Sequence, residues 1–510
     1  MSATDDKAAI TAKDNKDIAK GAGANFFGFI IRLGSRLPFL ILAVALFGNE
    51  LYGRYNYTIT TIEICAAFAT FGFKRSLFKF IHDDEYAGKY SIEQVMISAL
   101  LSSVLVSILF TGIIILSAEM LAFLFDYPEM VPGLKSLAPV VIIITALDVI
   151  LAGTRATRKM RYEVISRSLV EPYVLLGSML LFYYLDYSSF GLLMAYAVAL
   201  IAALIYALWG FCDLYSLEKT LKARPSLSLM KNLMRFSGPT AFHDLALLTF
   251  MRMDIFAVKF FFSEAILGVY TIAQQFATSV EKIYQSFYPI LSPVMAKSLV
   301  AKDYKTVEQQ MIMVSRWILM IQSILVILCI FYGETIFSAI LPEGIDQDMA
   351  MIGGMVLFFL MLGETINGGF GMADLPVIYR SPFFNPIISL TMIPVYILLA
   401  YLFTQYTSFG PIGVAMALCS TYLLMNLLRV MVIKKMFNIN MLKLRIFKVI
   451  FAAIATTFSF YLLENFLPID LRYGYGIAIG IPLLFLIYGI LLIIIAMEKS
   501  DIQKLKAKFL

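Results

Sequence analysis

Fourteen runs of about twenty mainly apolar residues follow one another along this 510-residue chain, separated by short polar segments. A run of that length is enough for a helix to cross the hydrocarbon core of a bilayer. The predicted spans are 25–47, 53–73, 94–117, 135–153, 164–184, 190–212, 236–262, 266–290, 311–333, 350–372, 383–404, 410–433, 446–464 and 475–497. The sequence therefore predicts an all-α, polytopic membrane protein with fourteen transmembrane helices and no sizeable soluble domain.

Composition excludes the soluble alternatives. Hydrophobic residues make up 60% of the chain and charged residues 15%, whereas an ordinary globular protein has about 45–50% and about 25%. The apolar excess must face lipid, which excludes a soluble protein, a secreted disulfide scaffold, a coiled coil and a disordered regulator. The four cysteines lie inside apolar runs without a CxxC spacing, so we expect buried thiols rather than disulfides or metal ligands.

The basic residues between the spans predict the orientation. Thirty lysines and arginines lie in the tails and alternate loops or at their edges, whereas the intervening loops and the span starts beside them hold only Arg54, Lys135 and Arg472. Since cytoplasmic loops carry the excess of basic residues, both termini are predicted to be cytoplasmic. No short apolar stretch with a cleavage site follows the first 24 residues, so no cleaved signal peptide is expected. The net charge of +6 is scattered along the chain, so nucleic acid is not an expected partner.

Three short matches in the same order indicate an internal duplication. They pair Phe47–Tyr55 with Phe262–Tyr270, Arg167, Ser168 and Pro172 with Arg380, Ser381 and Pro386, and Ser189–Gly191 with Ser408–Gly410. The repeated unit has six spans, an even number, so both copies enter from the same side and are related by an axis along the membrane normal. Transporters are commonly built from such repeats.

The duplication predicts two six-helix lobes followed by two additional helices. The predicted segments are a cytoplasmic N-terminal tail at 1–24, an N-terminal lobe at 25–212, an inter-lobe loop at 213–235, a C-terminal lobe at 236–433, two additional helices at 434–497 and a cytoplasmic C-terminal tail at 498–510.

Charged residues inside the predicted spans are the candidate functional residues. Each costs about 2.5–3.5 kcal/mol on insertion scales, so it is expected to face a cavity or a partner. Arg32 and Arg36 are four residues apart and share one face of the first span, as Arg252 and Lys259 do on the seventh. Because Arg suits forked binding of phosphate oxygens, a cationic cavity for a bulky anionic ligand is predicted. Its candidate residues are Arg32, Arg36, Arg252, Lys259, Lys282 and Arg316.

The same charges have simpler interpretations, which stay open. The arginines could form structural ion pairs with the acidic residues, and Lys259 could extend to the membrane surface. Arg167 and Arg429 are interpreted as anchors near a cytoplasmic helix end, Arg167 with a local pair to Glu171. The acidic candidates, for carrying a coupling proton or sodium ion or for serving as counter-ions, are Glu63, Asp148, Asp254, Glu281 and Glu364. His243 beside Asp244 is either a proton relay or a hydrogen-bonded pair.

Enzyme signatures are missing from the sequence. It contains no Walker A, GxSxG or HExxH pattern and only two histidines, so ATP hydrolysis, serine hydrolase chemistry and metal chemistry are not expected. The enzyme alternative is a membrane polymerase or ligase for lipid-linked sugars, which should carry a long outer loop. The predicted outer loops are all short, so a transporter without a metal or catalytic residues is favoured over an enzyme.

The chain resembles the polysaccharide-transporter branch of the multidrug/oligosaccharidyl-lipid/polysaccharide exporter superfamily. The resemblance lies in the arrangement of six, six and two spans and in the stretch Lys20–Gly28 that leads into a basic first helix. It also lies in Leu51–Tyr55 and Phe73–Phe78 at the ends of the second span, which are similar to those of bacterial O-antigen and exopolysaccharide repeat-unit flippases.

The resemblance implies a flippase for undecaprenyl-diphosphate-linked oligosaccharide in the bacterial inner membrane, working by alternating access of two lobes. It implies membrane lipids as partners, with a polysaccharide polymerase and a chain-length regulator as further candidates. No cofactor is expected, and a proton or sodium gradient is the candidate energy source. The alternatives are a peptidoglycan lipid-precursor flippase, an ion-coupled multidrug exporter and a non-transporting scaffold for polysaccharide assembly.

Overall fold

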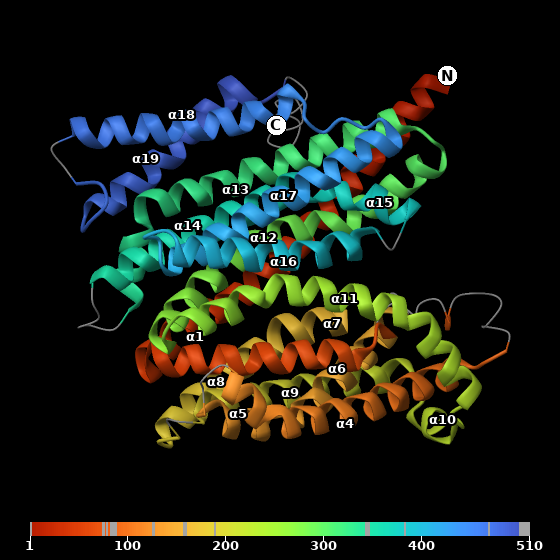
Figure 1. Ribbon diagram of the computed structural model, residues 1–510. Helices are drawn as coiled ribbons and strands as arrows, with labels where there is room; N and C mark the ends of the chain where they lie inside the picture. Colours follow the sequence, from red (N-terminus) through yellow and green to blue (C-terminus); the bar gives the residue numbers. More distant parts are fainter. Residues whose placement is uncertain are drawn as a thin grey trace. The chain divides into compact units, whose positions relative to one another are not determined.

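The computed structural model describes residues 3–73, 77, 80–81, 89–124, 128–156, 161–187, 190–341, 347–381, 384–467 and 470–498, with most side chains from residue 31 onward. Every regular element within these ranges is helical. The helices form two compact units (Figure 1). The N-terminal unit comprises Phe27–Thr271 with Pro386–Ile393, and the C-terminal unit comprises Ile272–Asn385, the described residues from Pro394 onward and the start of the chain. The predicted all-α polytopic membrane fold is confirmed.

The N-terminal unit is built from long helices and short connecting helices. They are most of α1 (Ala3–Thr70), α4 (Ile92–Leu124), α5 (Met130–Leu137), α6 (Val140–Ala156), α7 (Arg161–Ile165), the π-helix η1 (Ser166–Val170), α8 (Glu171–Tyr184), α9 (Gly191–Leu214), α10 (Leu217–Lys222) and α11 (Leu227–Phe261). Within this unit α6 packs against α4 and α9, and α8 packs against α9 (Figure 1).

The C-terminal unit contains the remaining elements. They are most of α12 (Glu264–Val300), α13 (Tyr304–Ile340), α14 (Gln347–Phe370), the 3-10 helix η2 (Gly371–Ala373), α15 (Asp374–Arg380), most of α16 (Phe384–Gln405), α17 (Pro411–Phe437), α18 (Leu444–Phe466), α19 (Gly476–Leu491) and the π-helix η3 (Leu492–Ala496). Helix α14 packs against both α13 and α17, and α18 packs against α13 and α19 (Figure 1).

Ten of the described helices are long and apolar enough to cross a membrane, or eleven when the bent pair of α5 and α6 is taken as one span. Two of the predicted spans lie in α1, which consists of two helices joined at the non-helical Gly48. Helices α11 and α12, with 35 and 37 residues, are long enough to span but more polar. Each predicted span thus falls on a described helix, and the count of fourteen stays a prediction.

Local sequence signals set where several helices begin. Ser91 and Gln94 form a reciprocal capping box at the start of α4, with both backbone–side chain hydrogen bonds at 3.2 Å. The Ser226 hydroxyl accepts from the backbone N–H of Leu229 at the start of α11. These side chains satisfy backbone donors that the first turn of a helix leaves unpaired. Polar residues before apolar runs therefore fix the entry points of the spans.

The two copies of the duplicated motif contact each other within the N-terminal unit. Gly53, in the second half of α1, packs against Gly268 at the start of α12, and a Cβ atom on Gly268 would lie 2.1 Å from the backbone oxygen of Asn49. These two glycines occupy equivalent positions in the aligned stretches Phe47–Tyr55 and Phe262–Tyr270. Only a residue without a Cβ allows the two helix backbones to approach this closely.

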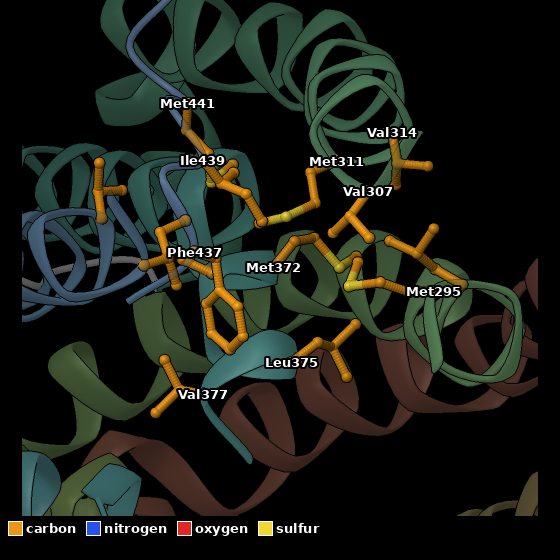
Figure 2. Packing of buried hydrophobic residues seen from close by; sticks show 14 of the residues in the cluster. Met295, Val307, Met311, Val314, Met372, Leu375, Val377, Phe437, Ile439 and Met441 are labelled. Carbon is orange, nitrogen blue, oxygen red and sulfur yellow. The ribbon is translucent and has the colours of Figure 1, made fainter. Parts of the chain in front are cut away.

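A methionine-rich core holds one end of the C-terminal unit together. Met295 from α12, Met311 from α13 and Met372 from η2 point into this cluster, beside Phe437 at the end of α17 (Figure 2). The following residues Ile439 and Met441 are also buried there. Because Met fills irregular gaps between helices, the cluster fixes the end of α17 and the connection to α18 against α12, α13 and α15.

Candidate anion-binding site

The first two candidate arginines lie on one face of α1 in the N-terminal unit. Arg32 and Arg36 are both partly buried. The Ser35 hydroxyl donates to the backbone oxygen of Arg32 at 3.0 Å, and the Tyr173 hydroxyl of α8 donates to the backbone oxygen of Ile31 at 3.2 Å. Helix α8 therefore positions the part of α1 that carries the two guanidinium groups.

Arg167 reaches the same region from the π-helix η1. Pro172, in the first turn of α8, has no backbone N–H to donate, which interrupts the α-helical ladder just after η1. A π-helical turn of this kind redirects side chains and is frequent at functional sites. Arg167 pairs with Asp148 of α6 at 2.5 Å and with Glu171 at 2.7 Å. The predicted local pair with Glu171 is confirmed, and Asp148 is an additional partner.

Arg252 of α11 extends this group of charges. It pairs with Glu63 in the second half of α1, with 3.4 Å between the two side chains. Electrostatic interactions connect Arg32 with Arg36, Glu171, Arg167 and Glu63. The helices of the N-terminal unit thus bring together one charged cluster, which comprises Arg32, Arg36, Glu63, Asp148, Arg167, Glu171 and Arg252.

The charges in this cluster are unevenly matched. Arg167 is held by the carboxylates of Asp148 and Glu171, and Arg252 pairs with Glu63. Within the part of the chain that the structure describes, neither Arg32 nor Arg36 forms an ion pair, and the buried Nε of Arg32 has no hydrogen-bond partner. A guanidinium group presents a fork of donors suited to phosphate or carboxylate oxygens. The cluster therefore offers donors to an anionic ligand at Arg32 and Arg36.

Three other predicted ligand-binding residues make contacts elsewhere. Lys259, nearly buried in α11, lies 3.6 Å from Glu264 at the start of α12. Lys282 of α12 donates to Gln285 at 2.5 Å in the C-terminal unit. Arg316 of α13 is also in the C-terminal unit. The structure places Arg32, Arg36 and Arg252 in one cluster of the N-terminal unit, whereas Lys259 contacts Glu264 in that unit and Lys282 and Arg316 belong to the C-terminal unit.

Arg316 fastens the end of the last helix to α13. Its guanidinium donates to the backbone oxygen of Ala496 at 2.7 Å and lies 3.4 Å from Glu498. Glu498 in turn pairs with Arg445 at the start of α18 at 3.0 Å. Arg316 is 3% exposed, so these contacts replace the water that its charge requires. They support a structural role for Arg316 in docking the two additional helices.

We expect Arg316→Leu to lower the free energy of unfolding by about 2 kcal/mol, because the Ala496 carbonyl and Glu498 lose a buried donor. Unfolding of the purified protein in a denaturing detergent series measures this loss. Arg445→Leu removes an exposed partner of the same Glu498 and is expected to cost less than about 0.5 kcal/mol. If Arg316→Leu leaves stability unchanged and abolishes anion binding, the structural role is wrong and Arg316 binds the ligand.

The acidic candidates divide between the two units. Glu63 and Asp148 belong to the charged cluster as counter-ions of arginines. Asp254, fully buried in α11, accepts hydrogen bonds from the Tyr270 hydroxyl and the backbone N–H of Ile255. These contacts favour a structural role for Glu63, Asp148 and Asp254 over the binding of a coupling ion.

Glu281 and Glu364 are buried in the C-terminal unit. Glu281 accepts a hydrogen bond from Gln285, and Glu364 accepts one from Tyr422. The side chains of His243 and Asp244 lie outside the described residues.

Arg167, which the sequence analysis interpreted as an anchor near a helix end, belongs to the charged cluster. Its spacing of four from Glu171 was visible, but Asp148 lies nineteen residues earlier and on another helix. The three-residue arrangement forms only because the fold brings Asp148 of α6 to Arg167 of η1. Arg429, interpreted as a surface anchor, is 6% exposed and lies in the C-terminal unit.

No metal centre is formed by the described residues, among which no group of three or more His, Cys, Asp or Glu side chains is arranged to hold an ion. The charged cluster supplies positive charge and hydrogen-bond donors. Its guanidinium groups can bind and orient an anion by hydrogen bonds and charge.

Solved structures share this fold over most of the chain. One is "Lipid II flippase MurJ, inward closed conformation", with a TM-score of 0.70 and 16% identity over 93% of this chain and 98% of that chain. Another is an inward-facing multidrug resistance MATE family transporter of the MOP superfamily, with a TM-score of 0.62 and 14% identity over 80% and 98%. At this identity the likeness establishes the fold alone.

A third structure with this fold is a MOP superfamily transporter from Pyrococcus furiosus, described as having reversed polarity of its binding pocket. It has a TM-score of 0.59 and 14% identity over 83% of this chain and 96% of that chain.

A family model agrees with the fold. No curated protein matches the sequence of this chain. The model described as "Polysaccharide biosynthesis protein" matches residues 42–344, which is 303 of the 510 residues. This stretch includes Glu63, Asp148, Arg167, Glu171 and Arg252 of the charged cluster. Because the match covers more than half of the chain, the predicted resemblance is confirmed and the chain belongs to the polysaccharide biosynthesis protein family.

Proposed function

We propose that this protein is a flippase that translocates undecaprenyl-diphosphate-linked oligosaccharide repeat units across the bacterial inner membrane. The translocated units would serve the biosynthesis of a surface polysaccharide such as O-antigen or exopolysaccharide. The family and the transporter fold support movement of a lipid-linked sugar. The observation that carries the choice of ligand is the pair Arg32 and Arg36, which form no ion pair among the described residues.

A diphosphate satisfies this pair better than the other ligand classes do. Two guanidinium groups one helical turn apart present two forks of donors, and a diphosphate presents two sets of anionic oxygens. A cationic drug would be repelled by Arg32 and Arg36, so the multidrug-exporter alternative fits the cluster poorly. A peptidoglycan lipid precursor also carries a diphosphate and stays the second candidate, which the "Lipid II flippase" neighbour supports.

The remaining parts of the proposal follow from the sequence. Alternating access of the two predicted lobes would carry the diphosphate and sugars, with both termini in the cytoplasm as the basic residues predict. Membrane lipids would surround the protein. A polysaccharide polymerase and a chain-length regulator are the expected protein partners, because a translocated repeat unit is consumed by polymerisation.

We expect Arg36→Ala to weaken binding of an isoprenyl diphosphate by about 10-fold to 100-fold, the effect of losing a charge-assisted hydrogen bond worth about 1.5–3 kcal/mol. Binding to purified protein in nanodiscs measures this effect. Arg36→Lys keeps the charge without the fork and should fall between wild type and Arg36→Ala. Arg235→Ala, at an exposed position of α11, is the control and should bind normally.

The same variants test export in cells. Staining of surface glycan should fall in a strain that carries only Arg36→Ala or Arg32→Ala and stay normal with Arg235→Ala, at equal protein levels. If Arg32→Ala and Arg36→Ala both leave diphosphate binding and surface glycan unchanged, the proposal is wrong. Binding with normal surface glycan but defective cell-wall synthesis would favour the peptidoglycan precursor.

A further inference from the structure

A second charged group, formed by residues outside the charged cluster, lies where two helices of the N-terminal unit begin and end. Arg161 opens α7, and Asp213 lies in the last turn of α9. The Tyr162 hydroxyl accepts a hydrogen bond from Nη2 of Arg161 at 2.7 Å and donates one to Oδ2 of Asp213. The guanidinium carbon of Arg161 lies 4.7 Å from the centre of the Tyr162 ring. We call Arg161, Tyr162 and Asp213 the edge triad.

The middle residue of the edge triad is buried and the two charged residues are exposed. Tyr162 packs against Gly210 of α9, where a Cβ would lie 2.4 Å from a carbon of the ring. The side chains of Arg161 and Asp213 are 64% and 50% exposed, and Nη2 of Arg161 lies 3.8 Å from Oδ2 of Asp213. That distance is too long for a hydrogen bond. Tyr162 therefore holds both charges in place while they face the surroundings of the helices.

An exposed apolar face of α9 leads to Asp213. Its residues follow one another at intervals of three or four and are Met194, Val198, Ile201, Ile205 and Trp209. Asp213 comes four residues after Trp209 and continues the same face. From Ile201 to Asp213 the helix rises about 18 Å, whereas one leaflet contributes about 15 Å of hydrocarbon. A lipid that lies along this face therefore has its headgroup at the level of the edge triad.

Two aromatic side chains of α9 stand beside the edge triad. The ring of Trp209, which is 59% exposed, lies 6.1 Å from the ring of Tyr162 and 5.5 Å from the ring of Tyr206. Tryptophan and tyrosine are enriched where the hydrocarbon of a membrane meets the headgroups. The faces of such rings also attract ammonium groups. A guanidinium group, a carboxylate and aromatic faces thus meet at one point of the membrane surface.

From this arrangement we infer that the edge triad, together with Tyr206 and Trp209, binds a phospholipid with a phosphoethanolamine headgroup. The Arg161 guanidinium would bind the phosphate, and the Asp213 carboxylate would accept hydrogen bonds from the ammonium group. In this headgroup a two-carbon linker joins the two opposite charges, which matches the neighbouring opposite charges of the edge triad. The acyl chains would lie along the apolar face of α9.

Other headgroups satisfy the edge triad less well. Phosphatidylglycerol brings no cation to Asp213, whose carboxylate would repel its net negative charge. Phosphatidylcholine brings a cation, but its ammonium group has no N–H to donate to the carboxylate. The inference is independent of the proposed function, because none of its residues belongs to the charged cluster.

Quenching of tryptophan fluorescence by lipids with brominated acyl chains tests this inference. The chain has two tryptophans, so Trp317→Phe leaves Trp209 as the only one. The purified variant is placed in vesicles of mixed lipids, one of which is brominated. The reference is a galactosyl diacylglycerol, which carries neither phosphate nor ammonium. We expect phosphatidylethanolamine to bind beside Trp209 about 2-fold to 5-fold more tightly than phosphatidylcholine, the range for exposed charge pairs.

Two further variants in the Trp317→Phe protein separate the roles of the charges. Asp213→Asn should abolish the preference for phosphatidylethanolamine over phosphatidylcholine. Arg161→Gln should weaken both lipids by the same factor relative to the galactolipid, because both carry a phosphate. Glu218→Gln on α10 is the control, since Glu218 is 75% exposed and also pairs with a basic residue, Lys222. It should leave the lipid preference unchanged.

Three results would overturn the inference. Equal quenching by phosphatidylethanolamine and phosphatidylcholine would show that Trp209 is only an aromatic anchor. A preference for phosphatidylglycerol would show an anionic-lipid site, and an equal effect of Glu218→Gln and Asp213→Asn would show a response to surface charge in general. The comparison of lipids in Trp317→Phe needs no change in the edge triad, so it decides the question even if the variants of Arg161 and Asp213 do not fold.

Discussion

Replacing Arg167 with methionine is expected to lower the free energy of unfolding by about 3 kcal/mol. The substitution leaves Asp148 and Glu171 without their shared cation, and their side chains are only 10% and 15% exposed. Breaking a buried ion pair by removing one partner costs about 3–5 kcal/mol. The lower end applies because the Arg167 side chain keeps 26% exposure and some water can reach the site. Detergent-induced unfolding of the purified protein measures the change.

Neutralising the carboxylates of Asp148 and Glu171 tests whether their unpaired charges cause the loss of stability. Arg167→Met combined with Asp148→Asn and Glu171→Gln should recover most of the lost stability, since no uncompensated charge remains. Arg161→Met removes an arginine six residues earlier whose side chain is 64% exposed and lies 3.8 Å from Asp213. That control should change stability by less than about 0.5 kcal/mol. Equal losses in Arg161→Met and Arg167→Met would contradict the proposed pairing.

Gly268→Ala is expected to destabilise the protein by about 3 kcal/mol, at the upper end of the range for overpacking. The added Cβ would lie 2.1 Å from the backbone oxygen of Asn49, so α1 and α12 must separate. The obstacle is backbone rather than the end of a flexible side chain, so a rotamer change does not relieve it. Gly53→Ala, whose Cβ would meet the Glu264 oxygen and the Gly268 nitrogen at 2.8 Å, should act in the same direction.

At two other helical glycines, replacement by alanine is expected to stabilise the protein. A Cβ on Gly112 of α4 or Gly177 of α8 would meet nothing within 4 Å. Because alanine favours a helix over glycine, each change to alanine should stabilise by about 0.5–1 kcal/mol. The same unfolding assay compares all four variants. A neutral Gly268→Ala would show that the contact between the duplicated stretches is looser than the structure describes.

The positions of the spans were predictable because the signal is local. A run of apolar residues such as 410–433 must be a helix in a bilayer wherever the rest of the chain lies, since every backbone group has to be satisfied within the segment. The observed helix α17 begins at Pro411 and ends at Phe437. Helices α11 and α12 show the limit of this local signal. Their charged and polar residues lower the mean hydropathy, and the partners of these residues are distant in the chain.

The candidate site was predicted only in part for the same reason. Arg32, Arg36 and Arg252 were recognisable as charges at membrane depth, and the local spacing of Arg167 and Glu171 indicated their pair. Nothing local distinguishes Arg316 from them, and yet its partners, Ala496 and Glu498, lie at the other end of the chain.

The sequence alone determined that this is a polytopic helical membrane protein, where its helices lie and which charges sit among apolar residues, because hydrophobicity over about twenty residues is a property of the segment itself. The tertiary structure decided which charges neutralise one another. Arg252 meets Glu63 across 189 residues and Arg167 meets Asp148 across nineteen. Coulomb interaction and hydrogen bonding depend on distance in space, so only the packed helices show that, among the described residues, Arg32 and Arg36 form no ion pair.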